Sequence, residues 1–357
     1  MQHAAAYQPQ FGLCIPVFAN PGRGFFRTPG LASLDPADAV QSAVDAESFG
    51  YDSIWVADHL IHGVDGGILE GWTTLCVIAG RTSRIKLGTI HLAQPFREPA
   101  MAAKMAASLD ALSGGRLIFF YDCGWNAQEV QAYGLAWPDE AERIDRMDEG
   151  LDLIKHLWSD AAPGDFQGRY YQTHDAVCLP GPVQRPRPPI WLGEARHDAW
   201  LDVICRHADG WNSVPASVAR LGEKLAGVRA SCQRIGRDVS ELEISLEIQI
   251  LVRPTEAEAR RELLRIADLP LSPRRPPRDD LVTAVRDNPA TPLSSLIDDW
   301  LVGDPAAVAA RIREYQSLGV SHFMLWFLDL PSREGLRLFA EQVIPLVNAG
   351  AGKGGSA

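Results

Sequence analysis

AESFGYDSIWVADH, residues 46–59, joins the end of a predicted helix to a predicted strand. Gly50 suits the left-handed conformation that closes a helix. The β-branched and aromatic run after it, YDSIWV, is typical of a strand. Two polar residues, Asp58 and His59, follow that run directly. The segment therefore predicts a fold that alternates helices with strands and carries titratable residues at a strand end.

The same alternation of short apolar runs and longer helical patterns continues along almost the whole chain. The predicted strands are residues 11–17, 51–56, 85–92, 117–122, 189–193, 209–214, 242–252 and 321–327. Each of these eight strands is followed by a helical pattern. This order favours a closed parallel barrel over an open sheet. We therefore predict an α/β protein with a (β/α)₈ TIM barrel.

One domain, residues 1–350, accounts for this pattern, and two insertions interrupt it. The first insertion, at about 159–187, is rich in glycine, proline and aromatic residues. The second, at about 268–302, contains the proline-rich run LPLSPRRPPRDD, and we expect it to form a lid that excludes water once substrate binds. Residues 351–357 are predicted to be a flexible tail.

Charge and composition narrow the class of protein. The net charge of −11 argues against a nucleic-acid surface, which needs clustered lysine and arginine. The six cysteines form no CxxC pair, so neither a zinc knuckle nor a redox dithiol is indicated. The first ten residues, MQHAAAYQPQ, lack a charged region followed by an apolar one, so we expect no secretory signal. No run of about 18 apolar residues that could span a membrane is present. We expect a cytoplasmic enzyme with neither nucleic acid nor membrane as a partner.

Barrel enzymes carry their reacting groups where strands end. Two histidines, His59 and His91, and two carboxylates, Asp58 and Asp122, occupy such positions. We predict that Asp58 orients the His59 imidazole for proton transfer. The alternative is an ordinary loop, with an aspartate capping the next segment beside a solvated histidine.

Further strand-end residues could contact ligands. The segment from Gly193 through Glu194 and Arg196 to His197 opens a helix and suits a phosphate, although it also reads as an ordinary helix start. Phe18, Asn20, Gln249 and Trp326 are the predicted substrate-pocket residues, although aromatic residues near barrel strands are more often core.

The segment CGWNAQEV follows the fourth predicted strand. Its residues Trp125, Asn126 and Glu129 could line a cofactor and fix the loop, or could simply cap the following helix. A metal site built from His59, His62 and His91, with Asp58 or Asp122, is a weaker alternative. His-x-x-His on a loop is a poor metal spacing, and we predict no metal.

Several blocks of this sequence together resemble a known family, the luciferase-like flavin oxidoreductases. The blocks are AESFGYDSIWVADH (46–59), SRIKLGT (83–89), MAAKMAASLDALSGGRL (101–117), CGWNAQEVQAYG (123–134), PVQRPRPPIWLG (182–193), RHADGWNS (206–213) and VGDPAAVAARIREYQSLGVSHFML (302–325). The resemblance implies a TIM-like barrel that binds FMN or the related deazaflavin coenzyme, often as a homodimer or homotetramer.

The resemblance also implies roles for particular residues. The family's catalytic histidine after the second strand falls on His59, with the preceding acid at Asp58. An unusual backbone at the end of the third strand, on which the flavin ring rests, falls around Ile90 and His91. The predicted cofactor-binding residues, from the resemblance and from positions at and after strand ends together, are Thr89, His91, Asp122, Asn126, Gly193, Glu194, Arg196 and His197.

One departure concerns the substrate. Alkanesulfonate monooxygenases of this family carry an Arg-x-His pair on the seventh strand, where this sequence has Glu247 and Gln249. A carboxylate in place of a cation is expected to repel an anionic substrate. The sequence therefore argues against an alkanesulfonate.

The resemblance favours a monooxygenase that takes reduced FMN from a partner flavin reductase and uses O₂ to oxidise a small organic substrate. The alternative is a dehydrogenase or reductase that uses the deazaflavin coenzyme, in which His59 assists a hydride transfer. A non-catalytic flavin-binding protein is a third reading, but such a protein needs neither Asp58 nor His59. A metal-dependent hydrolase is the last alternative.

Overall fold

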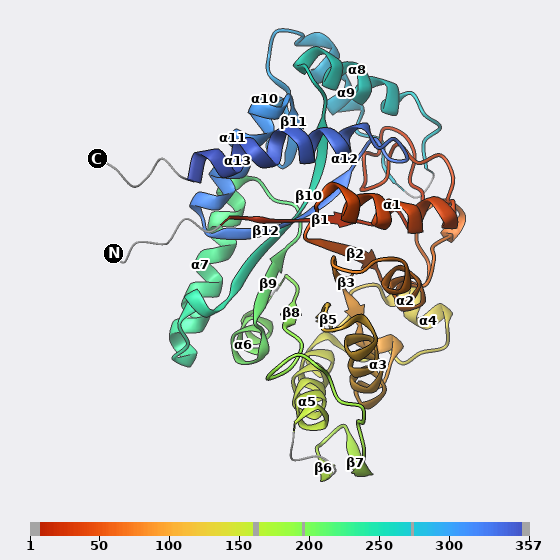
Figure 1. The fold of residues 1–357 in the computed structure, drawn as a ribbon, viewed down its shortest axis with the longest axis vertical. Coiled ribbons are helices and arrows are strands. Elements are labelled where there is room, and N and C mark those ends of the chain that lie inside the picture. The colour runs from red at the N-terminus through yellow and green to blue at the C-terminus, as the bar shows by residue number, and fades with distance from the viewer. Residues whose placement is uncertain (1–7, 160–163, 195–196, 273–274, 352–357) are drawn as a thin grey trace.

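A closed parallel barrel forms the centre of the molecule in the computed structural model, which describes residues 8–159, 164–194, 197–272 and 275–351 (Figure 1). The barrel strands are β1 (Gln10–Cys14), β2 (Ser53–Ala57), β3 (Lys86–Ile90), β5 (Leu117–Asp122), β8 (Ile190–Leu192), β9 (Gly210–Ser213), β10 (Glu243–Val252) and β12 (Val320–Phe327). Each pairs in parallel with its neighbours, and β12 pairs with β1 to close the ring. The predicted (β/α)₈ TIM barrel is confirmed.

Helices surround this barrel (Figure 1). The main ones are α1 (Pro36–Phe49), α2 (Gly71–Arg81), α3 (Pro99–Ser113), α5 (Glu140–Trp158), α6 (Asp198–His207), α7 (Val218–Ile235), α8 (Glu256–Ala267) and α11 (Pro305–Ser317). Shorter helices are α4 (Ala127–Ala132), α9 (Asp279–Asp287), α10 (Leu293–Leu296), α12 (Glu334–Leu338) and α13 (Ile344–Ala351). Short 3₁₀ segments lie at Val64–Gly66, Gln94–Phe96 and Val239–Glu241, and a π-helical turn at Phe339–Val343 joins α12 to α13. Within the described ranges, no helix is long and apolar enough to cross a membrane.

Most predicted strands differ from the observed ones only at their ends. The first was predicted to continue to residue 17 but stops at Cys14, because the backbone N–H of Val17 turns back to the Ile15 carbonyl. The third strand is interrupted after Ile90 and resumes as β4 (Leu92–Ala93), which pairs with β5.

The first insertion is not irregular throughout, as its composition suggested. Strands β6 (Gly164–Gln167) and β7 (Gln172–Ala176) form an antiparallel hairpin. The Glu149 carboxylate on α5 accepts hydrogen bonds from the backbone N–H groups of Arg169, Tyr170 and Tyr171. This carboxylate fixes the turn of the hairpin to the barrel.

The second insertion also differs from the prediction over much of its length. It contains α9, α10 and the strand β11 (Trp300–Gly303), which adds to the edge of β10. Leu263, Val285 and Trp300 belong to a separate apolar cluster between this insertion and α8. From Asp279 onward the insertion is therefore packed structure, and the lid prediction applies at most to residues 268–278.

Two tryptophans fill the barrel. Trp55 and Trp191 are buried, with ring centroids 5.2 Å apart. Each indole lies against a glycine on a neighbouring strand: a Cβ atom on Gly88 would be 2.2 Å from Trp55 Cζ3, and one on Gly210 would be 2.5 Å from Trp191 Nε1. The glycines therefore leave the volume that the indoles occupy, as close packing requires.

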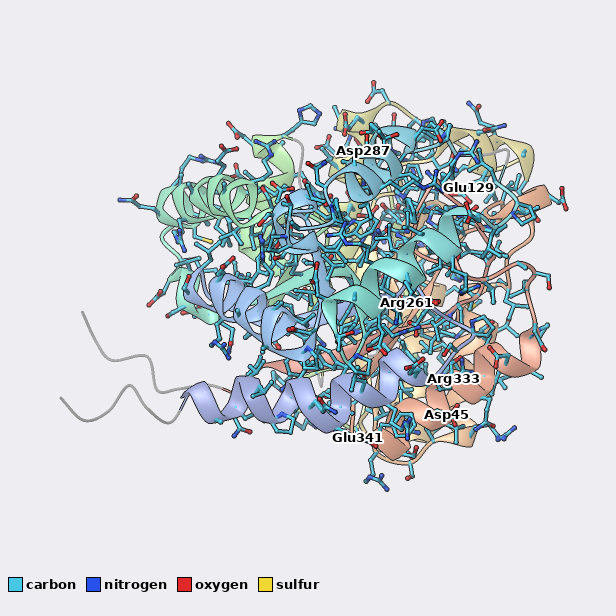
Figure 2. The ribbon with its side chains drawn as sticks, turned by 90° about the horizontal axis from the view of Figure 1, so that it is seen from above. Asp45, Glu129, Arg261, Asp287, Arg333 and Glu341 are labelled. Atoms are coloured by element: carbon cyan, nitrogen blue, oxygen red, sulfur yellow. The ribbon has the colours of Figure 1, made fainter. Side chains whose placement is uncertain are left out.

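Charged residues reinforce the closure of the barrel at α1. Arg333, at the start of α12, donates to the carboxylates of Asp38 and Asp45 on α1 at 2.7 and 2.9 Å. Figure 2 shows Arg333 and Asp45 side by side at the edge of the molecule. The last βα unit is in this way tied to the first.

We predict that Gly88→Ala destabilises the protein by about 1–3 kcal/mol, because its methyl group would overlap the Trp55 ring. The matched control is Gly80→Ala on α2, where a Cβ atom meets open space and alanine favours the helix. Urea unfolding of both variants measures the effect. Equal stability of the two variants would contradict this account of the barrel core.

Candidate functional site

A pocket opens at the carboxyl ends of β2, β3 and β5. Its lining includes the predicted residues Asp58, His59, His91, Asp122 and Asn126, together with Arg27, Trp125 and Glu129. The strand ends therefore bring these predicted residues together in one cavity.

His59 is oriented by Glu129 on α4, which is labelled in Figure 2. The two side chains are buried, and His59 Nδ1 lies 2.7 Å from Glu129 Oε1. The other oxygen, Oε2, accepts the backbone N–H groups of Leu60 and Ile61 at 2.9 and 3.2 Å. Burial raises the pKa of Glu129, but the hydrogen bonds from His59 and the two N–H groups outweigh burial and leave this pKa below its usual value.

An ionised carboxylate only accepts hydrogen bonds, so Glu129 requires the proton of a neutral His59 to be on Nδ1. The Nε2 atom of His59 then carries a lone pair and can accept a proton. A histidine held by a carboxylate in a cavity is the arrangement expected of a general base.

The predicted role of Asp58 as the partner of His59 is corrected by this geometry. Asp58 accepts two hydrogen bonds from the Arg97 guanidinium, at 2.8 and 3.0 Å, and one from Ala93 N at 2.9 Å. Its carboxylate thus holds together the loops that follow β2 and β4. Adjacency in sequence suggested the pair, but the two side chains point to different partners.

His91 also lines the pocket, next to Asp122. The Ile90–His91 peptide bond is cis, at the position where the resemblance implied an unusual backbone. His91 Nδ1 is 3.6 Å from Asp122 Oδ2, and His91 Nε2 is buried without a hydrogen-bond partner among the described residues. Burial lowers the pKa of His91 to about 4, so the imidazole is neutral at pH 7.

Gly193 lies directly behind these two side chains. A Cβ atom at Gly193 would be 3.2 Å from both Asp122 Oδ2 and His91 Nε2. The glycine therefore lets the end of β8 approach them closely. Thr89 contributes differently, because its hydroxyl donates to the Phe120 carbonyl inside the barrel at 3.2 Å.

The predicted phosphate-binding residues after β8 have partners within the protein. The Glu194 carboxylate pairs with Lys224 at 2.8 Å, and His197 Nε2 is 2.9 Å from Glu140. Arg196 lies outside the described residues. A phosphate site at this helix start remains a prediction.

The predicted substrate residues gather on another side of the barrel mouth, around Arg27. The Arg27 guanidinium pairs with the buried Glu247 at 2.8 Å, and Trp326 Nε1 donates to the same carboxylate oxygen at 2.6 Å. Gln249 Oε1 accepts from the backbone N–H of Arg27. Phe18 packs on Trp326, with ring centroids 5.7 Å apart. Asn20 Oδ1 accepts from the Ser272 hydroxyl.

This cluster corrects the electrostatic argument from the sequence. Glu247 was expected to repel an anionic substrate, but its charge is compensated by Arg27 from the β1–α1 loop. The sequence contained no signal for this pair, because the loop has no periodicity and lies far from β10 in the chain. Among the described residues, no group of three or more histidines, cysteines or acids could hold a metal ion.

We predict that His91→Gln reduces the acid sensitivity of the protein. The unfolded chain protonates His91 near its ordinary pKa of 6.5, whereas the folded protein does so only near 4, so protonation of the unfolded chain lowers the stability of the fold as pH falls. Between about pH 8 and pH 5, wild type should lose about 2 kcal/mol more unfolding free energy than the variant.

Urea unfolding of the coenzyme-free protein at both pH values measures this loss. His174→Gln is the control, because His174 lies on the hairpin with a side chain that is 71% exposed. Parallel pH dependence of wild type and His91→Gln would exclude a buried, neutral His91.

Comparison with known proteins adds to this geometry. The family model for luciferase-like monooxygenases matches residues 15–322. The chain is 29% identical over 330 residues to an F420-dependent glucose-6-phosphate dehydrogenase of Nakamurella multipartita, covering 89% of this chain and 95% of the relative. It is also 29% identical over 320 residues to the enzyme of the same name from Kineococcus radiotolerans, covering 87% and 93%.

Solved structures agree with the fold. An F420-dependent secondary alcohol dehydrogenase superposes with a TM-score of 0.73 at 20% identity, over 95% of this chain and 99% of that one. A long-chain alkane monooxygenase superposes with a TM-score of 0.76 at 15% identity, over 98% and 92%. At these identities the likeness concerns the barrel architecture alone.

The curated relatives correct the cofactor predicted from the sequence. We predicted a monooxygenase that uses reduced FMN and O₂, with a flavin reductase as partner. The relatives found by sequence are instead dehydrogenases named for coenzyme F420. The prediction of FMN was wrong, and the partner reductase loses its support with it.

Proposed function

The chain belongs to the luciferase-like monooxygenase family, and within it we propose an F420-dependent dehydrogenase that oxidises a small hydroxylated substrate. The observation that carries this proposal is the buried His59–Glu129 pair, which presents a proton-accepting nitrogen to the pocket. Sequence relatives with F420-dependent dehydrogenase names support the choice of coenzyme.

The pocket has features that fit a deazaflavin. It is lined by the aromatic rings of Phe96 and Trp125 and by several hydrogen-bonding groups. The buried Nε2 atom of His91 needs a hydrogen-bond partner, which a polar edge of a bound ring would supply. His91, Asp122 and Asn126 would hold the coenzyme there, and coenzyme F420, when bound, supplies the acceptor for a hydride.

His59 provides the acid–base half of the reaction. The substrate hydroxyl donates a hydrogen bond to His59 Nε2, since Nδ1 is occupied by Glu129. As the carbon loses a hydride, the O–H bond breaks, its proton moves to Nε2, and the alcohol becomes a carbonyl. Glu129 then stabilises the positive charge on the imidazolium.

His62 and Trp125 restrict the His59 ring. His62 stacks on it with ring centroids 4.8 Å apart, and Trp125 meets its edge at 5.4 Å. Together with Glu129, these contacts leave the imidazole little freedom to rotate. A fixed base of this kind lowers the entropic part of the barrier.

We predict that His59→Gln lowers turnover with F420 by about 10²–10⁴-fold, the usual contribution of a general base. Coenzyme affinity should change little, because His59 acts on the substrate proton. Glu129→Gln should lower turnover less, since an amide still accepts the Nδ1 proton, and should shift the pH profile. The exposed histidine variant His174→Gln is the control. Unchanged turnover in His59→Gln would remove His59 from the reaction.

The cofactor itself is tested by binding. Fluorescence titration or calorimetry with F420, and separately with FMN, should show tighter binding of F420 by about tenfold or more, a difference of at least about 1.4 kcal/mol. Tight binding of FMN alone would contradict the proposed dehydrogenase.

A further inference from the structure

Two arginines lie on one aromatic ring beside the pocket. The guanidinium carbon of Arg275 is 3.5 Å from the centre of the Phe26 ring, and that of Arg27 is 4.8 Å from the same centre. Arg27 belongs to the β1–α1 loop, and Arg275 belongs to the proline-rich segment before α9. Two segments distant in sequence therefore bring two cations together.

The positive charge of this pair is only partly compensated. Glu247 pairs with Arg27 and also accepts from Trp326 on the same oxygen. Arg275 has no carboxylate partner within the part of the chain that the structure describes. Burial lowers the pKa of Arg275, and the nearby charge of Arg27 lowers it further.

Two partly buried like charges repel each other, and one carboxylate cannot neutralise both. Phe26 offsets a part of this cost through its contacts with both cations. An anion bound between them would remove the rest. The arrangement thus has the electrostatic character of an anion-binding site.

The backbone holds Arg27 in place for such a role. Its N–H donates to Gln249 Oε1 at 2.9 Å, which fixes the loop on the end of β10. The guanidinium itself is held by Glu247 at 2.8 Å. It therefore does not have to be ordered when a ligand arrives, and preorganisation of this kind favours binding.

The pair is also connected to the catalytic histidine. Arg27 lines the same pocket as His59. Phe26 lies 5.9 Å from His62 between ring centroids, and His62 stacks on His59. A ligand that occupies the pocket at His59 can thus extend along these rings towards Arg27 and Arg275.

We propose that Arg27 and Arg275 bind an anionic group of the substrate, a phosphate or a carboxylate, while the carbon to be oxidised lies at His59. This inference rests on the proposed function for the location of the reacting carbon. Both kinds of anion form charge-assisted hydrogen bonds with guanidinium groups. The pair therefore selects substrates that carry such a group.

The test uses inorganic phosphate as probe and the full-length, coenzyme-free protein. Isothermal titration calorimetry gives the phosphate Kd for wild type, Arg275→Gln, Arg275→Lys and Glu247→Gln. Arg23→Gln is the matched control, because Arg23 lies in the same loop but pairs with Asp279. We leave Arg27 unchanged, since its removal would strand the buried Glu247.

Arg275→Gln should raise the phosphate Kd by about tenfold, as expected for the loss of a charge-assisted hydrogen bond. Arg275→Lys should retain most of the affinity and Arg23→Gln all of it. Glu247→Gln should lower the Kd, because it removes the competing carboxylate. Equal phosphate affinity in wild type and Arg275→Gln would overturn the proposal.

A parallel F420 titration of the same variants identifies the source of the anion. F420 affinity should be the same in wild type and Arg275→Gln. If the substitution weakens F420 binding and leaves phosphate binding unchanged, the anion belongs to the coenzyme and the substrate assignment is overturned. Failure of wild type to bind F420 would instead contradict the proposed function. The phosphate titrations alone do not test that function.

Discussion

The packing of Trp55 and Trp191 against glycines fixes the interior of the barrel, and the site depends on it. Glycines on neighbouring strands leave the volume that the two indoles fill. Trp55 also donates to Ser53, whose hydroxyl is 2.8 Å from Nε2 of the buried His322. Trp55 lies on β2, so its packing holds in place the strand that Asp58 and His59 follow. Asp58 and His59 therefore reach the pocket from a rigid support, as a base that must meet one particular proton requires.

The sequence predicted what depends on local pattern. The alternation of strands and helices predicted the barrel, and the strand-end rule selected Asp58, His59, His91 and Asp122, which all line the pocket. The partners of these side chains were not predictable in the same way. His59 is oriented by Glu129, a residue 70 positions away, whereas the adjacent Asp58 accepts hydrogen bonds from Arg97. A pair of this kind depends on how loops approach each other in space, and no periodicity in one sequence encodes it.

The least accurate prediction from the sequence concerned the charge of the substrate pocket. Glu247 alone suggested a pocket hostile to anions, but Arg27 compensates its charge from a loop that joins β1 to α1. The sequence pattern also could not distinguish FMN from a deazaflavin as the coenzyme. The roles predicted for the residues recognised in the sequence, a proton acceptor and hydrogen bonds to a ring, suit reduced FMN and a deazaflavin equally. Relatives over almost the full chain, rather than the pocket residues, overturn the prediction of FMN and support the proposal of F420.

The central claim is that the site transfers a hydride to a deazaflavin without oxygen. The most direct measurement is anaerobic turnover with F420 and a panel of hydroxylated substrates, with and without a phosphate or carboxylate, while the absorbance of the oxidised coenzyme and the carbonyl product are followed together. The account predicts that coenzyme reduction and product formation proceed without O₂ and in equal amounts. It further predicts a slower rate when the transferred hydrogen is replaced by deuterium. Product that forms only when O₂ is admitted, and with consumption of O₂, would contradict it.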